Sequence, residues 1–140
     1  MSKYQSVLCA VDLSPNSFPV LETAKSITDK SNIQVLHICE HPITGYGEQT
    51  GNNLRVTEAQ IRQSAFPALK DIVEAAELNV TQSDIRFGKP AEVIHQVAVD
   101  NGIDLIIVGS HGKSGLTLLL GSTSNQVLHG SPCDLLTVRI

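Results

Sequence analysis

The chain has 140 residues, of which 41% are hydrophobic and 17% charged, and its formal net charge is −4 at pH 7. This length fits one domain, over residues 1–140, and the composition can bury a sizeable core, which rules out disorder as the main state. No apolar run approaches the roughly 18 residues of a membrane span, and the acidic balance with few aromatic residues disfavours nucleic-acid binding. The three cysteines lie in or beside apolar runs, which predicts reduced thiols and a cytoplasmic protein.

The first segment of the chain predicts a strand, a helix and a second strand. A continuous apolar run over residues 6–11 is typical of a strand that is buried on both faces. Ser14 and Pro15 are residue types that helices prefer at the N-cap and the first helical position, and they predict a helix over residues 14–29. A second strand is expected over residues 33–38.

A glycine-containing segment over residues 42–53 follows, and we interpret it as a loop, with a lid as one possible role. Thr57 and Gln60 have the spacing of a capping box, which predicts the start of a long helix over residues 57–76. Because Pro67 lies inside this pattern, a kink or a break is expected there.

The next segment repeats the alternation of strand and helix. Residues 83–87 alternate in polarity and predict an edge strand. A helix is expected to begin at Pro90 and to end at Gly102. Residues 104–108 are the clearest buried strand in the sequence.

The last segment begins with a loop over residues 109–120 whose second half is hydrophobic. Ser122 or Thr123 can cap a further helix, and the last strand is expected over residues 134–139.

Five strands that alternate with four helices predict an α/β domain with a doubly wound parallel sheet and helices on both faces. Right-handed crossovers favour the strand order 3-2-1-4-5. The chain then reverses its winding between the first and fourth strands, and open α/β sheets bind ligands at such a switch point. The loops that meet there begin at Asp12 and Gly109.

The residue types in these two loops suit a phosphorylated nucleoside. Gly109 and Gly112 allow the backbone to approach a ligand closely, and the Gly-Ser-Thr run at 121–123 would present N–H groups and hydroxyls to phosphates at a helix N-terminus. Lys113 could add a positive charge, and Asp12 could accept hydrogen bonds from a ribose hydroxyl. A capping role for Asp12 and a solvated position for Lys113 are the alternatives.

Common catalytic and nucleotide motifs are not matched. Ile107 stands where a Walker A loop needs glycine, Leu116 stands where a nucleophile elbow needs glycine, and the dinucleotide fingerprint is missing after the first strand. His37, Cys39 and His41 alternate as zinc ligands on a strand could, although no fourth ligand is apparent.

Five segments in order resemble the universal stress protein family, and the likeness covers nearly the whole chain. No single motif is strong, but the ordered set at these separations is specific. The segments are Ala10-Val11-Asp12-Leu13-Ser14, Leu36-His37-Ile38, Gly88-Lys89-Pro90-Ala91-Glu92-Val93-Ile94, Val108-Gly109-Ser110-His111-Gly112 and Leu120-Gly121-Ser122-Thr123.

This resemblance implies a cytoplasmic stress protein that binds ATP or AMP, with or without Mg²⁺, and that is not primarily an enzyme. A slow ATPase and a partner-binding protein without nucleotide are the alternatives. The family's nucleotide motif is G-x2-G-x9-G-[S/T], and here eight residues instead of nine separate Gly112 from Gly121. The resemblance also implies a homodimer through the last strand, between Leu135 and Arg139, where pairing would protect an apolar edge.

The implied roles divide the site residues into three groups. Those expected around adenine and ribose are Ala10, Val11, Asp12, Ile38, Val108 and Gly109. Those expected at the phosphates are Gly112, Gly121, Ser122 and Thr123. The less specific additions are His111 and Lys113.

Overall fold

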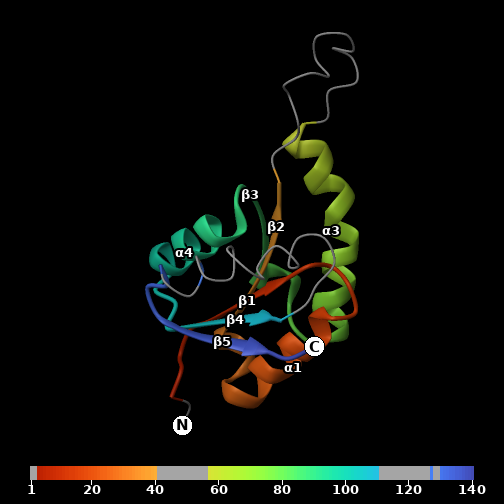
Figure 1. Cartoon of the computed structure of the whole chain (residues 1–140). Coiled ribbons are helices and arrows are strands. Elements are labelled where there is room, and N and C mark those ends of the chain that lie inside the picture. Colours follow the sequence, from red (N-terminus) through yellow and green to blue (C-terminus); the bar gives the residue numbers. More distant parts are fainter. Residues whose placement is uncertain (1–2, 41–56, 111–126, 128–129) are drawn as a thin grey trace.

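A computed structural model of the chain describes residues 3–40, 57–110, 127 and 130–140. Within these residues a five-stranded parallel sheet has the order β3-β2-β1-β4-β5, which confirms the predicted topology (Figure 1). The strands are β1 (Val7–Val11), β2 (Ile33–Cys39), β3 (Ser83–Phe87), β4 (Leu105–Gly109) and β5 (Asp134–Val138). Strands β3 and β5 therefore form the two edges of the sheet.

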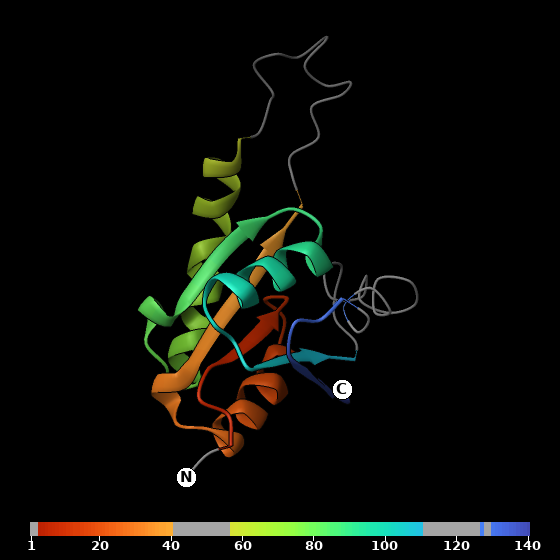
Figure 2. The same cartoon turned by 90° about the vertical axis from the view of Figure 1, so that its left-hand side faces the viewer.

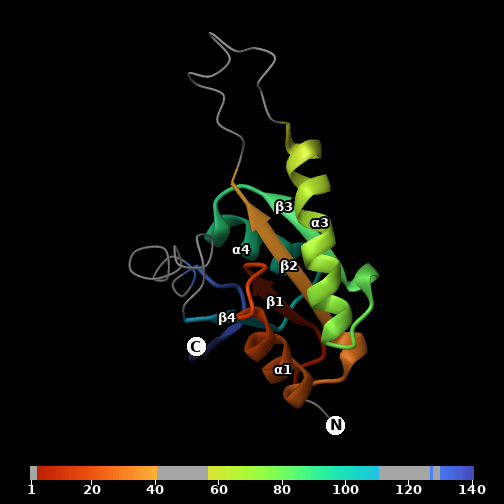
Figure 3. The same ribbon diagram turned by 90° about the vertical axis from the view of Figure 1, so that its right-hand side faces the viewer.

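Helices cover both faces of this sheet. Two of them, α1 (Ser17–Ile27) and α3 (Glu58–Ala75), lie on one face (Figure 3). Helix α4 (Pro90–Asp100) lies on the opposite face (Figure 2), where the helical residue Val127 also packs. Short 3₁₀ turns, η1 (Lys30–Asn32) and η3 (Val80–Gln82), lead into β2 and β3.

The core consists of two apolar layers that share the central strand. All five residues of β1 are buried. Val7, Cys9 and Val11 pack toward α1 and α3, whereas Leu8 and Ala10 pack toward α4. Because successive side chains of a strand point to opposite faces, a strand between two helical layers must be apolar at every position, as the run over residues 6–11 predicted.

Helix α1 is shorter than the sequence predicted. It begins at Ser17 and ends at Ile27, and Asn16 occupies the N-cap position. Ser14 is therefore not the N-cap, and its hydroxyl instead donates to Asp12 Oδ1 at 2.6 Å. The same hydroxyl accepts from the Asn16 N–H at 3.2 Å, within a turn that precedes the helix, and the N-cap lies two residues later than predicted.

Helix α3 starts at the predicted capping box. The Gln60 N–H donates to Thr57 Oγ1 at 3.2 Å, and the Thr57 N–H donates to Gln60 Oε1 at 2.9 Å. Of the kink or break expected at Pro67, the break is wrong, because the helix continues through this residue, while the kink stays a prediction. Pro67 and the Gln63 carbonyl that loses its donor both lie on the exposed side, where water can replace the missing bond.

Three predicted features lie wholly or mostly outside the described residues. These are the loop over residues 42–53, the loop over residues 109–120 beyond Ser110, and the start of the last helix at Ser122 or Thr123. None of the helices described is both long and apolar enough to cross a membrane.

Candidate functional site

The carboxyl ends of β2, β1 and β4 lie next to one another at the predicted switch point. Val11 pairs with His37 on β2, and Cys9 pairs with Ile107 on β4, so these strands end at similar heights. The chain leaves β1 toward β2 on one side and returns to β4 on the other side (Figure 3). Open α/β sheets bind their ligands at a switch point of this kind.

A buried carboxylate stands at the end of β1. Asp12 is 9% exposed, and its Oδ1 accepts hydrogen bonds from the Ser14 N–H at 3.0 Å and the Ser14 hydroxyl at 2.6 Å. The Ser17 hydroxyl lies 3.4 Å from the same oxygen. Hydrogen bonds to an ionised acceptor are stronger than neutral ones, so this network fixes the carboxylate before any ligand arrives.

The turn that carries Asp12 has an unusual backbone. Leu13 has a φ of 68°, in the left-handed region that leucine rarely adopts. Such a conformation costs about 1–3 kcal/mol and persists only where its surroundings impose it. The hydrogen bonds around Asp12 supply that constraint, and strain of this kind is commonly found at ligand sites.

His37 holds the end of β1 from the neighbouring strand. Its Nδ1 lies 2.9 Å from the Val11 carbonyl oxygen. Since a carbonyl only accepts hydrogen bonds, Nδ1 carries the proton in the neutral ring. Burial lowers the pKa of His37, while the bond to Val11 and the charge of Asp12 oppose that shift. The neutral ring is therefore the form that anchors Val11.

The end of β4 is tied to the last residues of the chain. Val108 and Gly109 are buried. The Ser110 N–H donates to the Val138 carbonyl at 2.8 Å, and the Ser110 hydroxyl accepts from the Ile140 N–H at 3.0 Å. These bonds fix the start of the glycine-containing loop against β5.

Half of the predicted site residues lie in the described part of the chain, and the structure brings them to the same end of the sheet. They are Ala10, Val11, Asp12, Ile38, Val108 and Gly109. The other predicted residues lie outside the described part: His111, Gly112, Lys113, Gly121, Ser122 and Thr123.

Sequence reasoning missed three residues that position the site, namely Ser14, Ser17 and His37. Ser14 could have been found, because an aspartate side chain commonly bonds the backbone two residues further on. Ser17 lies five residues from Asp12, and this signal does not reach it. His37 could not have been found in this way, because its bond to Val11 depends on strand pairing across 26 positions.

A zinc site is not supported by the described residues, which hold no cluster of three metal-binding side chains. His37 already uses Nδ1 for the bond to Val11, and His41 lies outside the described part. Cys39 is partly exposed as a free thiol, and burial raises its pKa.

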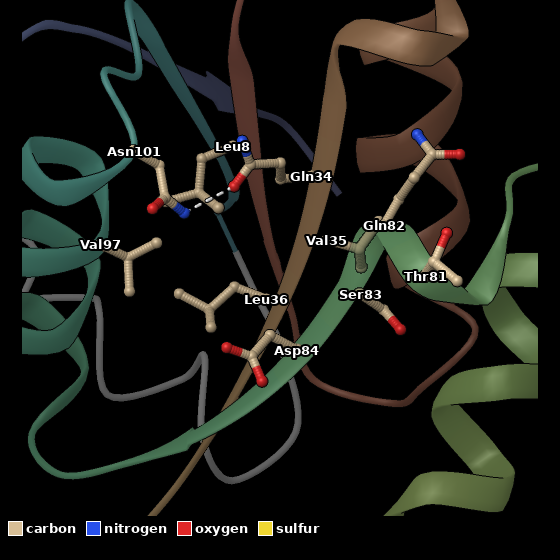
Figure 4. A pocket seen from close by; sticks show the side chains of 10 residues that line it. All are labelled: Leu8, Gln34, Val35, Leu36, Thr81, Gln82, Ser83, Asp84, Val97 and Asn101. Atoms are coloured by element: carbon tan, nitrogen blue, oxygen red, sulfur yellow. Dashed lines mark hydrogen bonds between the residues drawn. The ribbon is translucent and has the colours of Figure 1, made fainter.

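A cavity of about 240 Å³ lies elsewhere, between α4 and the amino-terminal halves of β2 and β3 (Figure 4). Leu8, Leu36 and Val97 form its apolar part. Asn101 donates to Gln34 Oε1 at 2.8 Å across one side of it. It is distant from the switch point, because Gln34 lies near the start of β2 and Asp12 follows the end of β1.

Comparison with known proteins supports one family. Residues 3–139 match the Universal stress protein family. The chain is 38% identical to Universal stress protein A homolog 2 of Coxiella burnetii, over 100% of this chain and 98% of that relative. The solved structure of MJ0577 has a TM-score of 0.72 at 28% identity and covers 98% of this chain and 96% of its own.

A second solved structure is a universal stress protein in complex with cAMP. It has a TM-score of 0.60 at 26% identity, and the match covers 99% of this chain and 98% of that chain. The agreement extends over essentially the whole length in the family match, the curated relative and both structures. The chain belongs to the universal stress protein family.

Proposed function

We propose that this stress protein binds an adenine nucleotide, ATP or AMP, at the switch point between the ends of β1 and β4. The observation that carries the proposal is the Asp12 carboxylate, which is buried at the switch point and oriented by Ser14 and Ser17. A fixed carboxylate at this position suits ribose hydroxyls, because it can only accept hydrogen bonds and a hydroxyl can donate them.

The relatives support the same ligand class. One structural neighbour at 26% identity was solved with cAMP, which contains adenine, ribose and phosphate. In this chain Ala10 and Val11 would border the nucleoside, and Ile38 would present backbone groups to the adenine edge. Val108 and Gly109 would line the opposite wall.

The phosphates would lie against the glycine-containing segments beyond β4. Gly112 and the run at 121–123 provide backbone N–H groups and hydroxyls, and His111 and Lys113 could add positive charge. A bound triphosphate would bring Mg²⁺ with it. Nucleotide that binds one loop conformation better than another shifts the population of that conformation, so the protein would act as a nucleotide-dependent regulatory module.

The first experiment identifies any nucleotide that copurifies with the protein. Protein prepared without added nucleotide is denatured, and the supernatant is analysed by HPLC with mass detection. A stoichiometric adenine nucleotide supports the proposal and names its ligand. If the preparation is empty and calorimetry with ATP and Mg²⁺ also shows no heat, the proposal is wrong and a partner-binding role without nucleotide replaces it.

A matched pair of variants then locates the ligand. Asp12→Asn removes one charge from the proposed ribose contact and should weaken ATP binding at least about tenfold. Asp71→Asn removes one charge from an exposed position on α3 and should leave binding unchanged. Equal affinities of the two variants would contradict the proposed location. Phosphate release measured in the same samples separates binding from slow ATP hydrolysis.

The proposal also includes a cytoplasmic homodimer that pairs through β5. Leu135, Leu136 and Val138 are only half-buried in the single chain, whereas every residue of β4 is buried. Pairing with a second copy would cover these side chains and the outer edge of β5. Sedimentation velocity tests this part, and a monomer at all accessible concentrations would contradict it.

A further inference from the structure

The two edges of the sheet differ in how their backbone groups are occupied. Strand β3 forms one edge. The N–H of Gly88, the residue that follows β3, donates to the Cys39 carbonyl of β2 at 3.0 Å. In a strand the N–H and C=O of one residue point to the same side, and the side alternates along the chain. Even-numbered residues of β3 therefore face β2, and Ile85 presents both of its backbone groups outward.

Both outward groups of Ile85 are already bonded to side chains. Its N–H donates to Asp84 Oδ1 at 2.8 Å, and its carbonyl accepts from Arg62 Nη1 at 2.6 Å. At the start of the strand, the Ser83 N–H donates to the Val80 carbonyl. A strand added at this edge would need the same groups.

The bonding side chains reach the edge from opposite faces of the sheet. Arg62 comes from α3, and its guanidinium lies 5.4 Å from the centre of the Phe87 ring. Asp84 borders the cavity beside α4 (Figure 4), and its Oδ2 accepts from Arg86 Nε at 2.5 Å. Arg62 Nη1 and Asp84 Oδ1 are 3.8 Å apart, so the two arms meet around the strand. We call Arg62, Asp84 and Arg86 the β3 clamp.

The exposure of the β3 clamp argues that it does more than stabilise the fold. The three side chains are 47%, 48% and 46% exposed in the order given. Ion pairs with this exposure contribute little to stability because water screens them and their side chains lose entropy. Charged side chains on an edge strand are a recognised way to prevent strand addition, and here they also occupy the backbone groups that a new strand would bond.

The opposite edge is not closed in this way. The Val138 carbonyl accepts from the Ser110 N–H on the β4 side of the strand. Because the side alternates along a strand, the backbone N–H and C=O groups of Leu135 and Thr137 point away from β4, toward the open edge. Within the ranges that the structure describes, no side chain bonds the backbone groups of these two residues. A sheet with one open edge forms closed pairs, whereas a sheet with two open edges can extend without limit.

We propose that the β3 clamp closes the β3 edge to a second copy of this chain and so limits edge-to-edge assembly to β5. The choice of β5 rests on the proposed homodimer, but the closure of β3 does not. Removing the clamp should open a second pairing edge without unfolding the protein.

The test compares Arg62→Ala/Asp84→Ala with a control, Lys70→Ala/Asp71→Ala, which removes the same two charges from exposed positions on α3. Circular dichroism checks folding, and sedimentation velocity over a range of concentrations gives the assembly state. The clamp variant should form species larger than wild type as concentration rises, and the control should match wild type. A folded clamp variant that sediments like wild type would overturn the proposal.

The outcomes also separate this proposal from the homodimer. If wild type is a monomer, the homodimer proposal fails, and the clamp variant should then associate where wild type does not. If both stay monomeric, the proposed closure fails as well.

Hydrogen exchange gives a second readout that does not depend on assembly. In Asp84→Ala the Ile85 amide loses its charged acceptor, so its exchange should become at least about tenfold faster. The Gly88 amide, which donates to Cys39, should exchange as in wild type. Unchanged exchange at Ile85 would contradict the proposed role of Asp84, and equal acceleration at both amides would mean that the variant acts by destabilising the whole fold.

Discussion

Replacing Ser14 by alanine tests whether the Asp12 carboxylate is held as the structure indicates. The Ser14 hydroxyl donates to Asp12 Oδ1 at 2.6 Å and accepts from the Asn16 N–H at 3.2 Å, and Ser14 is only 6% exposed. A buried hydrogen bond to an ionised group contributes about 1.5–3 kcal/mol. The Ser14 N–H remains as a donor to the same oxygen, so we expect a loss of about 2 kcal/mol in the free energy of unfolding.

Urea denaturation measures this loss directly. For a domain of this size, 2 kcal/mol corresponds to a midpoint shift of about 1 M. Ser26→Ala is the matched control, because the Ser26 hydroxyl bonds the Thr23 carbonyl on the exposed side of α1 and its loss should cost less than about 0.5 kcal/mol. Ser14→Thr keeps a hydroxyl and should recover part of the loss. If Ser14→Ala and the control cost the same, the proposed network does not hold Asp12.

Three further predictions concern the fold around the site. Gly88→Ala should lower the free energy of unfolding by about 2–3 kcal/mol, because φ at Gly88 is 141° and an added Cβ would lie 2.8 Å from a side chain of α4. An added Cβ at Gly102 would have no atom within 4 Å, so Gly102→Ala should cost about 1 kcal/mol. Equal urea midpoints for the two variants would contradict this order. The pKa of His37 in the folded protein lies below its ordinary value of 6.5, so as the pH falls the unfolded chain protonates His37 before the folded protein does. The contribution of the neutral His37 to the free energy of unfolding is therefore fully present above pH 6.5 and is lost as the pH is lowered below that value. His37→Asn keeps a donor for the carbonyl of β1 and should lose less stability than wild type from about pH 7 to about pH 5, and parallel pH curves would refute this. Burial raises the pKa of Cys9 to about 12, so iodoacetamide should label Cys39 in native protein well before Cys9. Peptide mass spectrometry measures the two labelling rates, and equal rates would contradict the burial of Cys9.

The strand order could be predicted because each step relied on features within a few residues of one another. Five buried or alternating runs and the handedness of crossovers were enough to place Asp12 and Gly109 at one end of the sheet. The capping box of α3 was likewise local, since Thr57 and Gln60 carry both partners of the motif. Patterns of this kind survive folding because tertiary contacts do not compete with them.

One error came from a local interaction that the helix-start pattern left out, and the other features that were missed depend on the folded structure. Ser14 before Pro15 has the form of a helix start, but the Asp12 carboxylate binds the serine hydroxyl and α1 begins at Ser17. The left-handed φ of Leu13 could not be expected from leucine. Arg62 lies 23 positions from the Ile85 carbonyl that it bonds, so the closed edge of β3 depends on how α3 packs against the sheet.

The proposed site has a nucleoside part, which the structure describes, and a phosphate part. Asp12, His37 and the ends of β1 and β4 are bonded in place, so the nucleoside part of a ligand would meet an ordered wall and lose little affinity to ordering. AMP and ATP share that part, so Asp12→Asn should weaken both by the same factor. Discrimination between them must then come from the phosphate side, and Gly112→Val with Gly121→Val should weaken ATP more than AMP. Calorimetry with both nucleotides decides this, and an equal loss for the double glycine variant would place the phosphates elsewhere.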